Sequence, residues 1–355
     1  MSEILLEAKN LSKDFPAGGG RKIHAVSDVS LRVYRGETLG LVGESGCGKS
    51  TLGRLLIRLL EPSGGELFLS GENVTAMKEK EFRRYRRQFQ MIFQDPYASL
   101  NPRMTVRDII AEPLKTWHIC PTKEETTKKV LELMEAVGVP GEFLLQYPHQ
   151  FSGGQRQRIS IARAIAMDPA LIVCDEPVSA LDVSVQNQVL NLLNRLKKER
   201  GLTYLFISHD LSVVRHISDR VCVMFLGRIF EVARTEDLFS HPLHPYARFL
   251  MNAIPVPDPH RRDDEKQILT GEPPSPVNPP SGCCFHTRCP YATEKCRTEV
   301  PALRDMGGRE VACHYPGIAD EGYGQPGPGA HPVPGVQPGI GAQQAPDRIQ
   351  EDRKE

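Results

Sequence analysis

One glycine-rich segment of the sequence has the spacing that suits binding of phosphate groups. In "GLVGESGCGKST", Gly43 is followed by four residues and then by Gly48, Lys49 and Ser50. A strand-like run, "TLGLV", precedes it and a helix-forming run, "TLGRLLIRLL", follows. Glycines at such a turn let backbone N–H groups close around phosphate oxygens. The residues expected in this phosphate loop are Gly43, Glu44, Ser45, Gly46, Cys47, Gly48, Lys49, Ser50 and Thr51.

Two acidic residues end a second apolar run, "ALIVCDEP". An acid at the carboxyl end of a strand beside a phosphate loop can hold a metal ion, and the next acid can polarise an attacking water. We therefore expect Asp175 and the Ser50 hydroxyl to bind Mg²⁺, Glu176 to act as general base, and Lys49 to contact the β- and γ-phosphates of a nucleotide.

A second candidate anion site lies between these two segments. Ser152, Gly153, Gly154 and Gln155 open a helix-like run, "SGGQRQRISIARAI", that carries several arginines. Free backbone N–H groups at a helix N-terminus favour an anion. A chain with two anion sites but one pair of catalytic acids suggests that the second site acts on a nucleotide held by another subunit.

In this arrangement the sequence resembles the ATP-binding subunits of ABC transporters. "FSGGQ" at 151–155 is similar to the family's signature segment. Gln94 in "MIFQDP", Asp182 in "SALD" and His209 in "FISHD" match the family's Q-loop, D-loop and switch positions in order. Phe15 in "LSKDF" is similar in position to the aromatic residue that stacks on adenine.

The resemblance implies a mechanism that needs two chains. In this family, two subunits pair head to tail, and each ATP lies between one subunit's phosphate loop and the other's signature segment. Gln94 would then contact the Mg²⁺ and the attacking water, and His209 the γ-phosphate. Closure of the dimer would complete each site.

The branch of the family that the sequence most resembles is the dipeptide and oligopeptide importers, which also includes nickel importers. The likeness covers residues 1 to about 316, and it includes "QMIFQDPYASLNPRMTV", "HPLHPYARFLMNAIPVPDP" and a cysteine-rich end. The chain looks most like the second ATPase subunit of dipeptide permeases. Import of nickel or another small solute is the alternative.

The resemblance also implies several partners. We expect two membrane permease subunits, a second ATPase that the family favours as a different chain, and an extracytoplasmic substrate-binding protein. The segment after Gln94 is where family members receive a helix of the membrane subunit. Exposed Tyr97, Leu100 and Met104 would form that docking surface, although core packing is an equal alternative for each residue.

Five of the nine cysteines lie between residues 283 and 313. Reducing conditions favour metal binding over disulfides for such a group. The gaps between Cys283, Cys289, Cys296 and Cys313 lack the Cys-x2-4-Cys spacing of structural zinc sites. These four thiols therefore favour a [4Fe-4S] cluster, as does the resemblance. Zinc, with His286 or His314 as replacement ligands, and free thiols remain alternatives; Cys284 is expected to be a bystander.

Composition excludes some classes of function. The 44 Lys and Arg residues balance 44 Asp and Glu residues, so net charge gives no indication of nucleic-acid binding. No apolar run approaches the roughly 20 residues of a membrane span, and the N-terminus lacks the pattern of a secretory signal. We expect a peripheral subunit at the cytoplasmic face of the inner membrane, with permease subunits supplied as separate chains.

Alternating periodicity predicts the fold that positions these residues. Apolar runs at 39–42, 171–175, 204–207 and 221–225 alternate with helix-period segments at 50–60, 126–137, 155–167 and 185–199. This predicts an α/β P-loop ATPase with a parallel core, an N-terminal antiparallel β subdomain and a helical lobe at about 95–165. The expected domains are an ABC ATP-binding domain at 1–255, a proline-rich linker and cysteine-rich module at 256–316, and a disordered tail at 317–355.

Other classes of ATPase that share this ATP-binding domain are disfavoured. A repair or chromosome-maintenance ATPase would carry long coiled-coil arms between the phosphate loop and the signature segment, and the interval between Lys49 and Ser152 has no room for them. A translation-factor ATPase would carry two heads in one chain. A phosphate-loop kinase of another family would lack the signature segment and His209.

Overall fold

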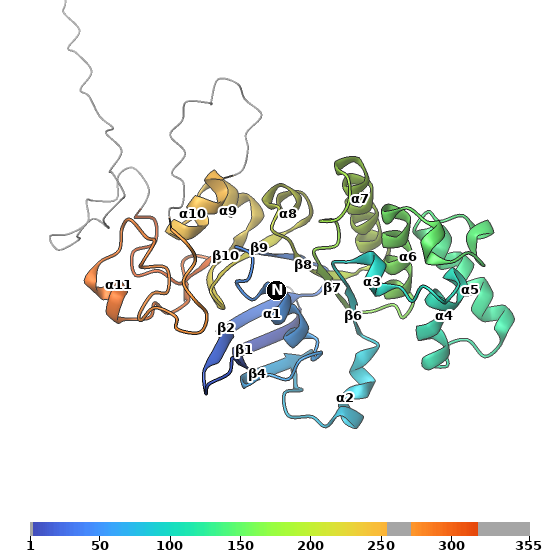
Figure 1. Cartoon of the computed structure of the whole chain (residues 1–355), viewed down its shortest axis with the longest axis horizontal. Coiled ribbons are helices and arrows are strands. Elements are labelled where there is room, and N and C mark those ends of the chain that lie inside the picture. Colours follow the sequence, from blue (N-terminus) through green and yellow to red (C-terminus); the bar gives the residue numbers. More distant parts are fainter. Residues whose placement is uncertain (1–2, 254–270, 319–355) are drawn as a thin grey trace, which may run out of the picture.

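Two β-sheets organise the chain (Figure 1). The computed structural model describes residues 3–253 and 271–318. The larger sheet has the strand order β11-β12-β10-β9-β3-β8-β7-β6, and the smaller has the order β2-β1-β4-β5. The predicted tail and the segment "IPVPDP" lie almost entirely outside the described residues.

The centre of the large sheet is parallel and buried on both faces. β3 pairs with β8 and β9, and β7 pairs with β8 and β6, all in parallel. Every residue of β3, β7 and β8 is buried, which explains why these strands read as continuous apolar runs. The strands are β3 (Thr38–Val42), β6 (Phe89–Ile92), β7 (Leu171–Asp175), β8 (Thr203–Ile207), β9 (Arg220–Phe225) and β10 (Arg228–Arg234).

The smaller sheet is antiparallel and forms the N-terminal subdomain. The long strands β1 and β2 pair along most of their length, and β4 pairs with the other edge of β1. Several register shifts mark irregularities in the β1–β2 pair, where extra residues bend and twist a strand. The strands are β1 (Ile4–Pro16), β2 (Lys22–Tyr34), β4 (Gly64–Leu69) and β5 (Glu72–Asn73).

Helices fill the interval between β6 and β7. They lie together at one end of the molecule, on the right in Figure 1, and bury a shared apolar core. Their bounds are α3 (Pro96–Ser99), α4 (Val106–Thr116), α5 (Lys123–Ala136), η1 (Gly141–Phe143), η2 (Pro148–Gln150) and α6 (Gly153–Ile165). Leu100 belongs to this core at 1% exposure, so the prediction that it is exposed for docking is wrong. Met104 is partly buried against the same core, and only Tyr97 of the three is exposed.

The remaining helices flank the large sheet. The structure contains all four predicted helical segments: 50–60 corresponds to α1, 126–137 to α5, 155–167 to α6 and 185–199 to α7. The four predicted strands are also present. The bounds of these flanking helices are α1 (Lys49–Leu56), α2 (Glu79–Arg86), α7 (Val183–Arg200), α8 (Leu211–Ile217), α9 (Thr235–Ser240) and α10 (Pro245–Asn252). Cys174 and Cys222 are buried residues of β7 and β9.

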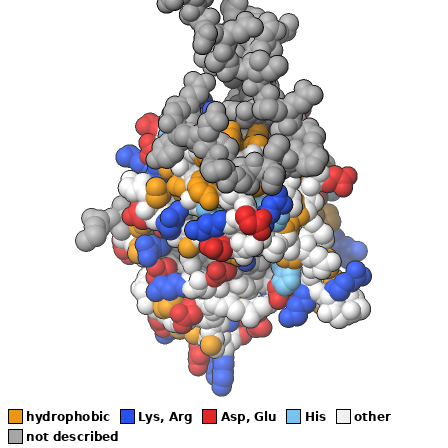
Figure 2. All heavy atoms as spheres, turned by 90° about the vertical axis from the view of Figure 1, so that its left-hand side faces the viewer, with side chains coloured by type: hydrophobic (Ala, Val, Ile, Leu, Met, Phe, Trp, Pro, Cys, Tyr) orange, Lys and Arg blue, Asp and Glu red, His pale blue; other side chains and the backbone are white. Residues whose placement is uncertain are grey.

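Residues 271–318 pack against the end of the large sheet opposite the helical lobe (Figure 1). This segment, called the C-terminal module below, contains α11 (Glu294–Thr298), β11 (Arg304–Asp305) and β12 (Glu310–Val311). β12 extends the sheet by pairing with β10. Figure 2 shows this end of the molecule, where Lys and Arg side chains are interspersed with Asp and Glu.

A buried ionic group joins the module to the sheet. The Glu231 carboxylate on β10 is fully buried and accepts hydrogen bonds from the backbone N–H groups of Leu243 and His244. It also accepts one from Arg309 of the module at 2.7 Å. Because an unpaired buried carboxylate is costly, these three donors fix the segment before α10 and the module relative to β10.

His244 caps α10 as a neutral side chain. Its Nδ1 accepts a hydrogen bond from the Tyr246 N–H, and its ring stacks on Phe230 with centroids 4.3 Å apart. Burial lowers the pKa of His244 from the ordinary 6.5 to about 3. The unfolded chain therefore binds a proton near neutral pH that the folded chain excludes, and this part of the stability is lost as the pH falls below 6.5 toward about 3.

We expect His244→Asn to weaken the loss of stability in mild acid, because asparagine can cap α10 but does not titrate. Between about pH 7.5 and about pH 5, the wild type should lose about 2 kcal/mol of unfolding free energy more than the variant does. Urea unfolding at both pH values measures this difference. Equal losses for the two proteins would contradict the assignment.

Candidate functional site

The phosphate loop joins β3 to α1 and depends on glycine at two positions. Gly43 and Gly48 have φ angles of 153° and 104°. A Cβ at either position would lie 2.1 Å from a backbone oxygen, that of Met224 for Gly43 and that of Ala25 for Gly48. Neither position can therefore accept a side chain without a shift of the surrounding backbone.

Lys49 is folded into the loop. It is 6% exposed, and its Nζ donates to the carbonyl oxygens of Gly43 at 2.8 Å and Glu44 at 2.9 Å. A buried ammonium group is costly unless its protons have acceptors. These carbonyls hold the cation at the mouth of the loop, where the positive end of α1 adds to the attraction for an anion.

Ser50 and Asp175 lie side by side, as the sequence predicts for two ligands of one metal. The Ser50 Oγ donates to Asp175 Oδ1 at 2.6 Å. Burial raises the pKa of Asp175, while the Ser50 hydrogen bond and Arg54, 3.8 Å from Oδ2, oppose that rise. A buried carboxylate beside a hydroxyl has the hard oxygen donors that Mg²⁺ binds.

Glu176 contacts the other two predicted catalytic side chains, those of Gln94 and His209. Its Oε2 accepts a hydrogen bond from Gln94 Nε2 at 2.9 Å, and its Oε1 lies 3.1 Å from His209 Nδ1. Glu176 has a φ of 48°, which is strained for a residue with a side chain, and its N–H donates to the Ile207 carbonyl oxygen. The backbone thus turns at Glu176, at the end of β7, where Gln94 and His209 converge on its side chain.

The signature segment is not brought to this site. Ser152 caps α6 in a capping box: its Oγ accepts from the Gln155 N–H at 3.4 Å, and its N–H donates to the Gln155 side chain at 3.0 Å. α6 belongs to the helical lobe, whereas α1 follows the phosphate loop (Figure 1). Among the described residues, no hydrogen bond or ion pair joins 152–155 to the loop at 43–51.

Phe15 and Asp182 also lie apart from the catalytic group. Phe15 is a partly buried residue near the end of β1, and Lys13 Nζ lies 5.3 Å from its ring centroid. Asp182 is an exposed residue that precedes α7. Both are accessible to a ligand or to a second protein.

A groove separates the sheet from the helical lobe beside Gln94. Its volume is about 790 Å³, and it is lined by Phe93, Trp117 and Gln94 among others. Nearby, Tyr97 is 61% exposed, and the Arg156 guanidinium of α6 lies 3.8 Å from its ring centroid. This cation–π contact connects the helix behind the signature segment to the chain that follows Gln94.

Four thiols in the C-terminal module line one small cavity of about 20 Å³. They are Cys283, Cys289, Cys296 and Cys313, and His286 and His314 line the same cavity. Cys284 does not line it. Burial raises the pKa of Cys283 to about 11 and that of Cys313 to about 12. Within the described ranges, no three His, Cys, Asp or Glu side chains converge closely enough to form a metal-ligand group as they stand.

Sequence reasoning missed two residues that contact the phosphate loop. Arg288 of the C-terminal module forms an ion pair with Glu44 at 2.9 Å, and the Tyr246 hydroxyl of α10 accepts the Glu44 N–H at 3.0 Å. The contacts span more than half of the chain and follow no local motif. The packing of α10 and of the module against β9 and β10 brings these residues to the loop.

Two family models match the chain. "ABC transporter" matches residues 26–179, which include the phosphate loop, the signature segment and Glu176. "Oligopeptide/dipeptide transporter, C-terminal region" matches residues 230–296. Within the part of the chain that the structure covers, no helix is both long and apolar enough to cross a bilayer.

Similar proteins cover most of the chain. The oligopeptide transport ATP-binding protein AppF of Bacillus subtilis is 51% identical over 88% of this chain and 97% of its own length. OppF of Escherichia coli, with the same description, is 50% identical over 88% and 96%. A solved dimeric ATP-binding cassette, MJ0796 bound to ADP and Pi, is 30% identical with a TM-score of 0.60, covering 65% of this chain and 98% of that one.

Proposed function

The chain belongs to the ATP-binding proteins of ABC transporters that carry the oligopeptide/dipeptide transporter C-terminal region, and on this premise we propose how it powers import. It is an ATPase whose hydrolysis drives the import of dipeptides or oligopeptides through a separate permease. The observation that carries the mechanism is the convergence of Gln94 and His209 on Glu176, one residue beyond the Ser50–Asp175 pair.

ATP would bind with its β- and γ-phosphates in the loop 43–51. Lys49 would exchange its two carbonyl acceptors for phosphate oxygens, an exchange that keeps the buried ammonium paired. When bound, Mg²⁺ would neutralise part of the phosphate charge, and Ser50, Asp175 and Gln94 are the residues that would hold it. Phe15 would stack on the adenine.

Glu176 would accept the proton of the attacking water. Its two carboxylate oxygens already engage Gln94 and His209, so these neighbours orient it before the nucleotide arrives. Once ATP is bound, His209 would turn to the γ-phosphate and Gln94 to the water. General-base catalysis of this kind contributes roughly 10²- to 10⁴-fold.

The site would be completed by a second ATPase. The signature segment 152–155 and the exposed Asp182 of this chain would meet a nucleotide held by the partner's phosphate loop, in a head-to-tail dimer. The similar cassette MJ0796 is described as a dimer with ADP and Pi, which supports this arrangement. We propose that the partner ATPase is a different chain.

ATP-binding subunits of peptide importers work with permease components in the membrane. We propose that the importer contains two permease subunits and that one of them docks a helix in the groove beside Gln94, which Phe93 and Trp117 line and the exposed Tyr97 adjoins. A peripheral position at the cytoplasmic face of the inner membrane and an extracytoplasmic substrate-binding protein complete the proposal. Nickel or another solute is the alternative cargo, and it is disfavoured because AppF and OppF are described as oligopeptide transport proteins.

For the C-terminal module we propose a [4Fe-4S] cluster. Support comes from four buried thiols that line one cavity, with Cys284 outside it. Thiolates are the usual ligands of such clusters, and the thiols would have to close on the metal from their present positions. Zinc is the alternative. The proposed domains remain 1–255, 256–316 and the tail 317–355, with the helical lobe at about 95–165.

Glu176→Gln tests the proposed hydrolysis. The variant should bind ATP as the wild type does, because the loop and the Ser50–Asp175 pair are untouched. Its ATPase rate in the assembled importer should fall by about a thousandfold, because the amide cannot accept the proton of water. Phosphate release and labelled-ATP titration measure the two quantities. Glu199→Gln, a matched change at an exposed position of α7, should keep the wild-type rate, and a near-wild-type rate for Glu176→Gln would reject the base role.

Gly153→Val tests the shared site. A Cβ at Gly153 would lie 3.3 Å from the flexible end of Leu181, so the helical lobe can accommodate it, whereas at Gly154 it would lie 2.4 Å from Val185. ATP binding to the isolated subunit should be unchanged. ATPase activity of the assembled importer should fall by about a hundredfold, because the valine side chain would keep the partner's nucleotide away from the backbone N–H groups. Gly64→Val, at an open position, is the control. Undiminished activity of Gly153→Val would contradict the dimer mechanism.

Metal analysis tests the thiol site. Protein purified without oxygen should be brown and contain about four iron atoms per chain. Cys289→Ser should lose most of the iron, and Cys284→Ser, a buried neighbour outside the cavity, should keep it. Stoichiometric zinc without visible absorbance would replace the cluster with a zinc site, and the absence of both metals would reject a metal role for the thiols.

A further inference from the structure

Glu44 of the phosphate loop is held from three directions. Its carbonyl oxygen accepts from Lys49, its N–H donates to the Tyr246 hydroxyl, and its carboxylate accepts from Arg288. The first contact is internal to the loop. The second comes from α10, and the third comes from the C-terminal module, 244 positions further along the chain.

Arg288 is built into the junction between the module and the sheet. Its side chain is 7% exposed, and one nitrogen, Nη1, lies 3.0 Å and 2.9 Å from the two carboxylate oxygens of Glu44. Its guanidinium lies 6.0 Å from the ring centroid of Phe225 at the end of β9. A charge in this position needs its partner, because an unpaired buried guanidinium or carboxylate is strongly disfavoured.

Aromatic packing sets the position of Arg288. Phe285, three residues before it, is fully buried and packs against Phe225 and Tyr246, with centroids 5.4 Å and 5.3 Å away. The ring of Tyr246 lies 4.8 Å from that of Phe225. Both residues that reach Glu44 from outside the loop, Tyr246 and Arg288, are therefore fixed by one aromatic cluster.

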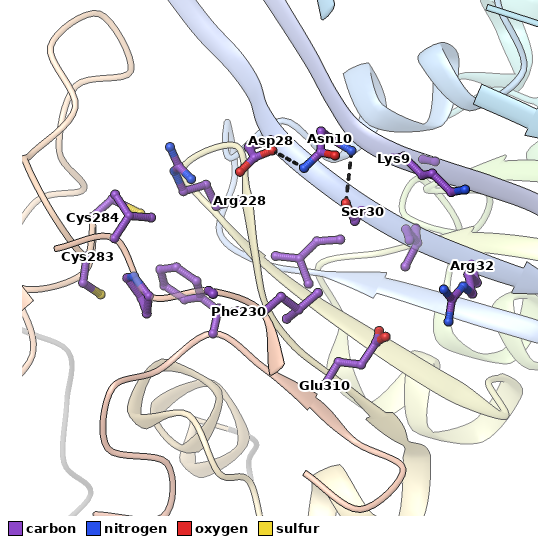
Figure 3. Close-up of a pocket in the computed structure, with 18 of the residues that line it drawn as sticks. Lys9, Asn10, Asp28, Ser30, Arg32, Arg228, Phe230, Cys283, Cys284 and Glu310 are labelled. Carbon is purple, nitrogen blue, oxygen red and sulfur yellow. Dashed lines mark hydrogen bonds between the residues drawn. The ribbon is translucent and has the colours of Figure 1, made fainter. Parts of the chain in front are cut away.

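The module leaves a cavity between itself and the smaller sheet. This cavity, of about 650 Å³, separates Cys283 and Cys284 from β1 and β2 (Figure 3). Lys9, Asn10 and Arg32 line the strand side of this cavity. Among the described residues, Arg288 is the only residue of the module with a hydrogen bond or ion pair to the phosphate loop.

We propose that Arg288 is a positioning residue for ATP binding, through which the C-terminal module holds the phosphate loop in its nucleotide-ready form. This deepens the proposed function and rests on it. Glu44 lies between Gly43 and Ser45 in a loop rich in glycine, which would otherwise lose much conformational freedom when ATP binds. Anchoring its side chain and its N–H beforehand lowers that entropic cost.

Arg288→Met tests the proposal, because methionine keeps much of the side-chain volume and removes the charge. The dissociation constant for ATP should rise about tenfold. In the assembled importer, the KM for ATP should rise with little change in kcat, since loop ordering affects the ground state and the transition state alike. Arg288→Lys should recover part of the affinity, because lysine restores the charge without the planar fork.

A second substitution separates loop positioning from general damage to the module. Arg304→Met removes an arginine whose hydrogen bond, to the Cys313 carbonyl oxygen, stays within the module, and it should keep wild-type ATP affinity. In the Glu44→Gln background, Arg288→Met should weaken ATP binding by no more than about twofold, because the two side chains act as one pair. Titrations are made well below each variant's thermal midpoint, so that only folded protein is compared.

The outcomes distinguish this inference from the proposed function. If the wild type binds no ATP, the proposed function itself fails. If the wild type binds ATP and Arg288→Met binds it equally well, or if Arg304→Met weakens binding as much, the positioning role is rejected and the ATPase assignment stands. A fall in kcat with unchanged KM would also reject it, because it would place the effect in the chemical step.

Discussion

The parallel pairing of β3, β8 and β7 is the constraint on which the site depends. Residues at the carboxyl ends of adjacent parallel strands meet at one edge of the sheet. β3 therefore delivers the phosphate loop, β7 delivers Asp175 and Glu176, and β8 delivers the segment that carries His209, all to one edge. β6, paired with β7, adds Gln94 from the other side. The four chemical parts are distant in sequence, and this register alone brings them within hydrogen-bond distance.

The same topology keeps the signature segment away from the catalytic group. The signature segment begins α6, whose N-terminus belongs to the helical lobe rather than to the sheet edge. Gly154 packs too closely on Val185 of α7 to allow a side chain, so one of the two glycines serves the packing of the lobe against α7. Gly153 has more space, because a Cβ there would lie 3.3 Å from the end of the Leu181 side chain. The contact between Arg156 and Tyr97 links α6, which the signature segment begins, to the chain beside the groove at Gln94.

Features encoded by local pattern could be predicted from the sequence. The glycine spacing before Lys49 and the apolar run before Asp175 are local signals, and both appear as expected. Leu100 was wrongly expected at the surface, because a single apolar residue in a loop segment does not reveal which side of the loop faces the core. The contacts of Glu44 with Arg288 and Tyr246 had no sequence signal, because they depend on how the C-terminal module and α10 pack on β9 and β10. The site around Glu176 was predicted in part: the motifs identified Gln94 and His209, but not their contacts with Glu176.

Two ion pairs that include buried side chains join the C-terminal module to the motor, and their chemistry argues for specificity rather than bulk stability. Replacing such pairs with apolar residues is often neutral or stabilising, whereas removing one partner is costly. The Arg309–Glu231 pair places the module on β10, and the Arg288–Glu44 pair connects it to the phosphate loop. An apolar contact would tolerate sliding of the module, but a charge pair fixes one position. Arg288 directly precedes Cys289, so a metal bound by the thiols, as proposed, would also restrain Arg288 and through it the Glu44 side chain of the phosphate loop.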